Sequence, residues 1–80
     1  MDVLHPCVAG LDVHKDSVYA CVRRVGPGGG VRETVRVFGT MTPDLLQLAD
    51  WLASEEVTHV AMESTGVYWK PVYYILDEQF

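Results

Sequence analysis

The sequence predicts a small α/β domain in which the elements follow the order β-β-β-α-β-α and form a mixed sheet with strand order 3-2-1-4. Three observations support this class. Three short strand-like runs are separated by turn residues, an apolar helical repeat follows, and a fourth strand-like run precedes a second helical pattern. The 80 residues suffice for one domain with a thin core, because a domain of this size buries only about 60% of the surface that its unfolded form exposes.

The first two strands are expected at residues 7–13 and 17–23, with only the polar turn 14–16 between them. So short a link favours an antiparallel hairpin. Cys7 and Cys21 lie on these strands, and we expect both to be reduced, buried thiols that pack as small apolar residues.

The glycine-rich segment 26–30 is the strongest turn signal, because glycine permits positive φ. It lacks the Lys-Ser or Lys-Thr ending of a phosphate-binding P-loop, so we expect a hairpin tip. In the following run, 31–38, valines alternate with polar residues, with Glu33 as the exception. This alternation predicts a third strand with one wet face, at the edge of the sheet.

The first helix is expected to begin with Thr42 as its N-cap and Pro43 at the first helical position, with Asp44 near the positive end of the helix dipole. The polar segment 54–56 ends the helix and leads to a fourth strand at residues 57–63. Four apolar residues at helical spacing predict the face that packs on the sheet: Leu45, Leu48, Ala49 and Leu52.

A second helical pattern follows the fourth strand and is rich in aromatic residues. Pro71 fits only near the start of this helix or in an irregular first turn, because proline lacks a backbone N–H. Aromatic side chains stack on nucleobases in some proteins, but at helical spacing Tyr68, Trp69 and Tyr73 are expected in the core. The pattern comprises Trp69, Val72, Tyr73, Leu76 and Phe80.

The order of the elements constrains the topology. A right-handed crossover places the fourth strand beside the first and parallel to it. The first strand then becomes central, which suits its nearly unbroken apolar character. Asp12 and Glu63 come near the carboxyl ends of these two strands, so we expect both at one edge of the sheet, where open α/β sheets bind ligands.

Two carboxylates on adjacent strands predict a divalent metal site. Neighbouring strands are about 4.8 Å apart, and Mg²⁺ takes oxygen ligands at about 2.1 Å, so one ion fits between Asp12 and Glu63. Without a partner, an acid at the end of a buried strand opposes folding. Two-metal chemistry on a phosphate substrate needs at least one or two more acids, and no later strand of this chain supplies them.

A structural alternative stays open for the same residues. Asp12 begins the hairpin turn in this interpretation, and Glu63 caps the following helix. His14 and Lys15 are expected to be exposed turn residues, with phosphate contact as the alternative. Residues 64–65, Ser-Thr, are expected to be N-caps, because no histidine is placed to activate them as nucleophiles.

The net charge of −5 argues against nucleic-acid binding through this segment alone, since phosphate-binding surfaces are basic. Such a surface is expected in further residues or on another subunit. No apolar run reaches the roughly 18 residues that span a bilayer, and the start lacks a secretory signal. We therefore expect a cytoplasmic location and no membrane partner.

Two motifs together resemble a known family: residues 10–16, Gly-Leu-Asp-Val-His-Lys-Asp, and residues 61–69, Ala-Met-Glu-Ser-Thr-Gly-Val-Tyr-Trp. They are similar to the amino-terminal part of the RNase H-like (RuvC-like) DEDD domain of IS110 insertion-sequence transposases. The second motif is the more specific, because it joins an acid to a Thr-Gly and a Tyr-Trp pair. The resemblance spans almost the whole chain, so we expect residues 1–80 to form one partial RuvC-like domain.

The resemblance implies that Asp12 and Glu63 are two of four acids that bind Mg²⁺ or Mn²⁺ for DNA strand cleavage and transfer. It also implies DNA as a partner, an RNA guide and a homo-oligomer. The family's other two Asp residues, and its carboxyl-terminal domain with a catalytic serine, have no counterpart in these residues. We therefore expect the chain to be inactive alone.

Two alternatives stay open. One is the amino-terminal piece of an actin-like or sugar-kinase ATPase, whose first hairpin also follows an Asp, although residues 13–16 lack the glycine that approaches phosphate in such hairpins. The other is a non-catalytic assembly module that binds a partner through exposed aromatic residues while the acids cap local structure.

Overall fold

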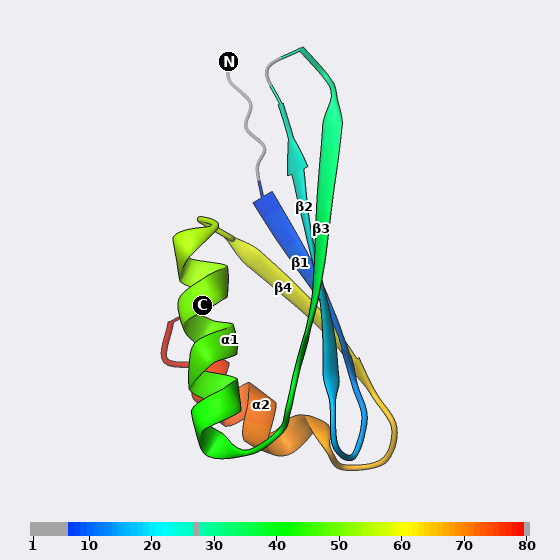
Figure 1. Ribbon diagram of the computed structural model, residues 1–80, viewed down its shortest axis with the longest axis vertical. Helices are drawn as coiled ribbons and strands as arrows, with labels where there is room; N and C mark the ends of the chain where they lie inside the picture. Colours follow the sequence, from blue (N-terminus) through cyan, green and yellow to red (C-terminus); the bar gives the residue numbers. More distant parts are fainter. Residues whose placement is uncertain (1–6, 27, 80) are drawn as a thin grey trace.

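The computed structural model describes residues 7–26 and 28–79, and it confirms the predicted class and topology. One mixed sheet has the strand order β3-β2-β1-β4. β1 pairs antiparallel with β2 and parallel with β4, and β2 pairs antiparallel with β3. In chain order the elements are β1 (Cys7–Val13), β2 (Val18–Val25), β3 (Val31–Phe38), α1 (Thr42–Ser54), β4 (His59–Ser64) and α2 (Trp69–Leu76) (Figure 1).

Both helices lie on the same side of the sheet, as Figure 1 shows. We call the side under the helices the core face and the other side the open face. Burial alternates strictly along β1, from buried Cys7 to buried Val13, because every second side chain points to the open face. The nearly unbroken apolar sequence of β1 therefore does not bury both faces of the strand, since no helix of the described residues covers the open face.

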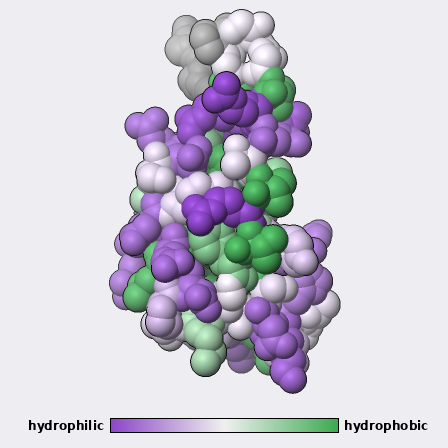
Figure 2. Space-filling view, in the orientation of Figure 1, coloured by the Kyte–Doolittle hydropathy of each residue, from purple (hydrophilic) through white to green (hydrophobic). Residues whose placement is uncertain are grey.

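β3 lies at the sheet edge as predicted, but its expected single wet face is wrong. Every residue from Val31 to Val37 is exposed, and only Phe38 is buried. Val35 and Val37 pair with Cys21 and Tyr19 on the open face, which no described element covers. On the other face, the β2–β3 hairpin extends beyond the end of α1, as Figure 1 shows. Figure 2 shows apolar surface, in green, among hydrophilic residues on the side of the molecule where β3 runs.

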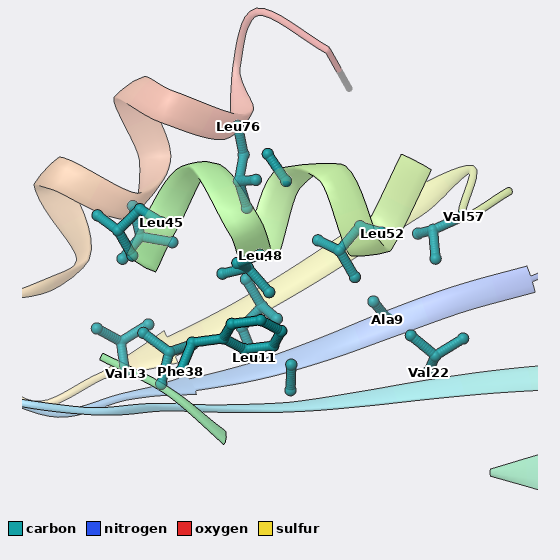
Figure 3. Packing of buried hydrophobic residues seen from close by; sticks show 14 of the residues in the cluster. Ala9, Leu11, Val13, Val22, Phe38, Leu45, Leu48, Leu52, Val57 and Leu76 are labelled. Carbon is teal, nitrogen blue, oxygen red and sulfur yellow. The ribbon is translucent and has the colours of Figure 1, made fainter. Parts of the chain in front are cut away.

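The core lies between the sheet and α1. The four apolar residues predicted for the sheet-facing side of α1 are all buried, and Leu48 and Leu52 point toward the strands in Figure 3. Leu48 has no exposed surface, and Leu11 of β1 and Phe38 of β3 lie beneath it. Phe38 also contacts Trp51 of α1, with ring centroids 5.7 Å apart. This packing fixes the crossover that joins β3 to β4.

The start of α1 differs by one residue from the prediction. Met41 occupies the N-cap position and Thr42 is the first helical residue. The Asp44 carboxylate accepts a hydrogen bond from the Met41 backbone N–H at 3.3 Å, which satisfies a donor that the helix leaves unpaired. Gly39 makes this arrangement possible, because a Cβ there would collide with the Asp44 side chain.

β4 begins at His59, two residues after the predicted start, because the preceding backbone completes the end of α1. The Val57 N–H donates to the Leu52 carbonyl at 3.1 Å, so this residue ends the helix instead of joining the sheet. Glu56 adopts a φ of 62°, which reverses the chain direction. Val57 is nevertheless buried and closes one end of the core.

α2 begins at Trp69, so Pro71 lies in the first turn, where its missing N–H costs little. Its buried residues are Val72 and Leu76, whereas Tyr73 is 44% exposed and Trp69 is 37% exposed. The expectation of core positions for the aromatic residues is therefore wrong, and Phe80 lies outside the described residues. Neither helix among residues 7–26 and 28–79 has the length and apolar character needed to cross a membrane.

Candidate metal centre

Asp12 and Glu63 are Cα partners in the parallel ladder between β1 and β4. Partners in adjacent strands direct their side chains to the same side of a sheet. Asp12 lies between buried Leu11 and Val13, so its side chain is on the open face, and Glu63 is exposed beside it. The topology thus brings the two acids together as the sequence predicted.

Both acids lie inside strands, each one residue before the strand ends. The hairpin turn closes after Asp12, where the His14 N–H donates to the Ser17 carbonyl at 2.8 Å. Asp12 is therefore a strand residue and does not begin the turn, because Val13 lies between them. Glu63 does not cap α2 either, because it lies in β4 and the first helical residue of α2 is Trp69.

The expectation that residues 64–65 cap a helix is wrong. Tyr68 occupies the N-cap position of α2, and no side-chain hydrogen bond caps the helix. The Ser64 hydroxyl instead donates to the Thr65 carbonyl at 3.0 Å. The chain turns at Gly66, which has a positive φ of 55° that glycine adopts without strain.

Both acids are exposed, and the exposed fraction of the Asp12 side chain is 59%. The premise that burial makes these acids costly is therefore wrong, since water screens the repulsion between exposed charges. The fold does not need an ion to offset that repulsion. The case for a metal site instead depends on the chemistry and the placement of the two donors.

The two acids differ in their partners. The Asp12 Oδ2 atom lies 3.1 Å from the Nε2 atom of His14, whose side chain is 41% exposed. His14 is thus half-buried against the first acid, whereas Lys15 is exposed as expected. Within the described part of the chain, Glu63 has no side-chain hydrogen bond or ion pair.

A shallow hollow of about 560 Å³ lies beside the carboxylates on the open face. Gly10 and Ala61 form part of its lining, and a Cβ added at Gly10 would meet no heavy atom within 4 Å. Tyr19 and Cys21 of β2 also contribute. Sequence reasoning missed this hollow, although the small residues two positions before each acid are a signal that could have indicated it.

The donor set suits a hard divalent cation, because Mg²⁺ is often bound by one or two carboxylates together with water and substrate phosphates. Among residues 7–26 and 28–79, no group of three or more His, Cys, Asp or Glu side chains is arranged to hold a metal ion. Asp12 and Glu63 therefore fit part of a metal site, not a complete one.

No curated protein matches the sequence. A family model described as a transposase, that of the DEDD transposases of the IS110 type, matches residues 9–80. The match includes residues 9–13 of β1 with Asp12, β4 with Glu63 and every element between them. The mixed sheet, in which β4 lies parallel to β1, is consistent with part of an RNase H-like fold. The chain therefore belongs to the IS110-type DEDD transposases.

Proposed function

We propose that Asp12 and Glu63 supply two of the four acidic ligands of a divalent-metal site that serves DNA strand cleavage and transfer. The observation that carries this proposal is their pairing on adjacent parallel strands, with both side chains on the open face. Membership of a DEDD transposase family supports it. Bound Mg²⁺ or Mn²⁺ activates the attacking oxygen and stabilises the leaving oxygen in reactions of this kind.

The two remaining acids and the catalytic serine are proposed to come from residues outside this chain. Residues 1–80 thus act as one part of a RuvC-like domain and are inactive alone, because two ligands leave most of the coordination of an ion to water. The net charge of −5 supports the proposal that other regions make most contacts to DNA and to an RNA guide.

The test is Mg²⁺- or Mn²⁺-dependent strand cleavage by the complete protein carrying Asp12→Asn. The amide keeps the size of the side chain and removes its charge, so we expect cleavage to fall below detection. Asp16→Asn is the matched control, because Asp16 is an exposed acid of the adjacent turn and is expected to be dispensable. Undiminished cleavage by the Asp12 variant would show that the assignment is wrong.

We also propose that the isolated chain self-associates through its open face. Val35 and Tyr19 are 62% and 49% exposed on that face, and no described element covers them. Exposed apolar surface of this kind favours association. Val35→Lys is therefore expected to reduce the concentration dependence of the sedimentation coefficient, while Thr34→Lys, on the opposite face of the same strand, has little effect. Equal effects of both changes would instead indicate pairing along the β3 edge.

A further inference from the structure

We propose that His14 is a positioning residue for Asp12: its imidazole, paired with the carboxylate through Nε2 and Oδ2, holds that carboxylate in one orientation. The inference rests on the proposed metal site, and it assigns a role to a residue that the four-acid set does not include. Its direct observation is the distance of 3.1 Å between His14 Nε2 and Asp12 Oδ2.

The strand geometry places the two side chains on the same side of the chain. His14 follows Asp12 by two positions and comes directly after the end of β1, so it continues the side of the strand that forms the open face. The imidazole is less exposed than the carboxylate, at 41% against 59%. The imidazole therefore lies beside one oxygen of Asp12 and leaves much of the carboxylate exposed.

A second contact holds the imidazole itself. The His14 and Tyr19 rings meet edge to face, with centroids 6.0 Å apart and an interplanar angle of 89°. Tyr19 is the Cα partner of Asp12 on β2, so all three side chains belong to one end of the open face. Aromatic pairs favour this arrangement, and the ring of Tyr19 restricts where the imidazole can lie.

The backbone of the turn is also anchored. The His14 N–H donates to the Ser17 carbonyl at 2.8 Å, which closes the hairpin. The Thr40 hydroxyl donates to the Lys15 carbonyl at 3.1 Å and ties the turn to the segment before α1. Ring and backbone contacts together make His14 a more rigid donor than an exposed turn residue without such contacts.

A rigid donor matters because an exposed carboxylate samples several rotamers, and ordering it on metal binding costs conformational entropy. Hydrogen-bonding partners of metal ligands typically change metal affinity by about 10–100-fold when they are removed. A pair this exposed contributes little to folding stability. The proposal therefore predicts an effect on metal affinity that is separate from any effect on stability.

Two substitutions separate the polar contact with Asp12 from the ring contact with Tyr19. His14→Phe keeps an aromatic ring against Tyr19 and removes the donor. His14→Gln loses the ring and keeps an N–H that reaches Asp12. The measurement is Mn²⁺ binding to the complete protein by titration calorimetry, which needs no catalytic turnover, with thermal unfolding of each variant as the control for folding.

We expect His14→Phe to weaken Mn²⁺ binding by about 10-fold and His14→Gln by no more than about 3-fold, with similar unfolding temperatures for both. Unchanged affinity in the Phe variant would overturn the inference. Equal losses in both variants would also overturn it, because they would make the imidazole itself a ligand. Asp12→Asn separates the positioning role of His14 from the proposed metal site. If Asp12→Asn abolishes Mn²⁺ binding and His14→Phe has no effect, only the positioning role is wrong. If Asp12→Asn retains Mn²⁺ binding, the proposed function is wrong as well.

Discussion

Replacing Glu63 with Gln in the complete protein is expected to lower the rate of DNA strand cleavage by about 10³-fold or more, as for other groups that act as one catalytic unit. Gln keeps the length of the side chain and its exposed position on β4, so the fold is expected to survive. What is lost is the charge that a divalent cation requires of an oxygen ligand. The measurement is single-turnover cleavage of a DNA substrate at saturating Mg²⁺.

The stronger form of this prediction concerns the double variant. Because Asp12 and Glu63 are Cα partners in one ladder, we propose that they hold a common ion, and adding Asp12→Asn to Glu63→Gln is then expected to cost little more. Effects that multiply would mean that the acids act independently. Glu78→Gln serves as a control, because Glu78 is an exposed acid that follows α2.

The parts of this fold that could be predicted are those for which local and long-range signals agree. The sheet-facing side of α1 is defined by a repeat of leucines, and the structure buries each of them. The crossover from β3 to β4 follows from element order and handedness. These two facts place β4 against β1, so the sequence alone predicts that Asp12 and Glu63 are neighbours.

The exposure of the open face could not be predicted in the same way. Val8 and Gly10 of β1 look like interior residues in the sequence, yet both are exposed because no described element covers the open face. The same holds for Trp69 and Tyr73 of α2, whose spacing is that of a core stripe. Periodicity indicates which residues share a face, but the burial of that face depends on whether another layer packs against it.

The contact of His14 with Asp12 was accessible in principle and was still missed. Residues two apart in a strand share a side, so the spacing alone places the imidazole near the carboxylate. A polar residue at a hairpin turn is normally solvated, and that expectation outweighed the spacing. The deciding feature is Tyr19, which comes from the opposite strand and holds the ring in place.

Leu48→Ala is expected to destabilise the chain by about 2–5 kcal/mol, the usual cost of truncating a fully buried leucine. Leu48 has no exposed surface and lies at the centre of the contact between α1 and the sheet (Figure 3). At roughly 0.05–0.15 kcal/mol per residue, the 80 residues have a total stability of about 4–12 kcal/mol, so this change removes a large part of it. The variant is therefore expected to be largely unfolded in mild denaturant.

Leu46→Ala provides a close control for this change. Leu46 lies in the same helix but is 49% exposed, so the two variants share the same change in helix propensity and differ in the burial that is lost. The Leu46 variant is expected to change stability by less than about 0.5 kcal/mol, measured by urea denaturation followed by circular dichroism. Equal stabilities would mean that α1 does not pack on the sheet. Because that packing maintains the crossover to β4, it would also remove the basis for pairing Asp12 with Glu63.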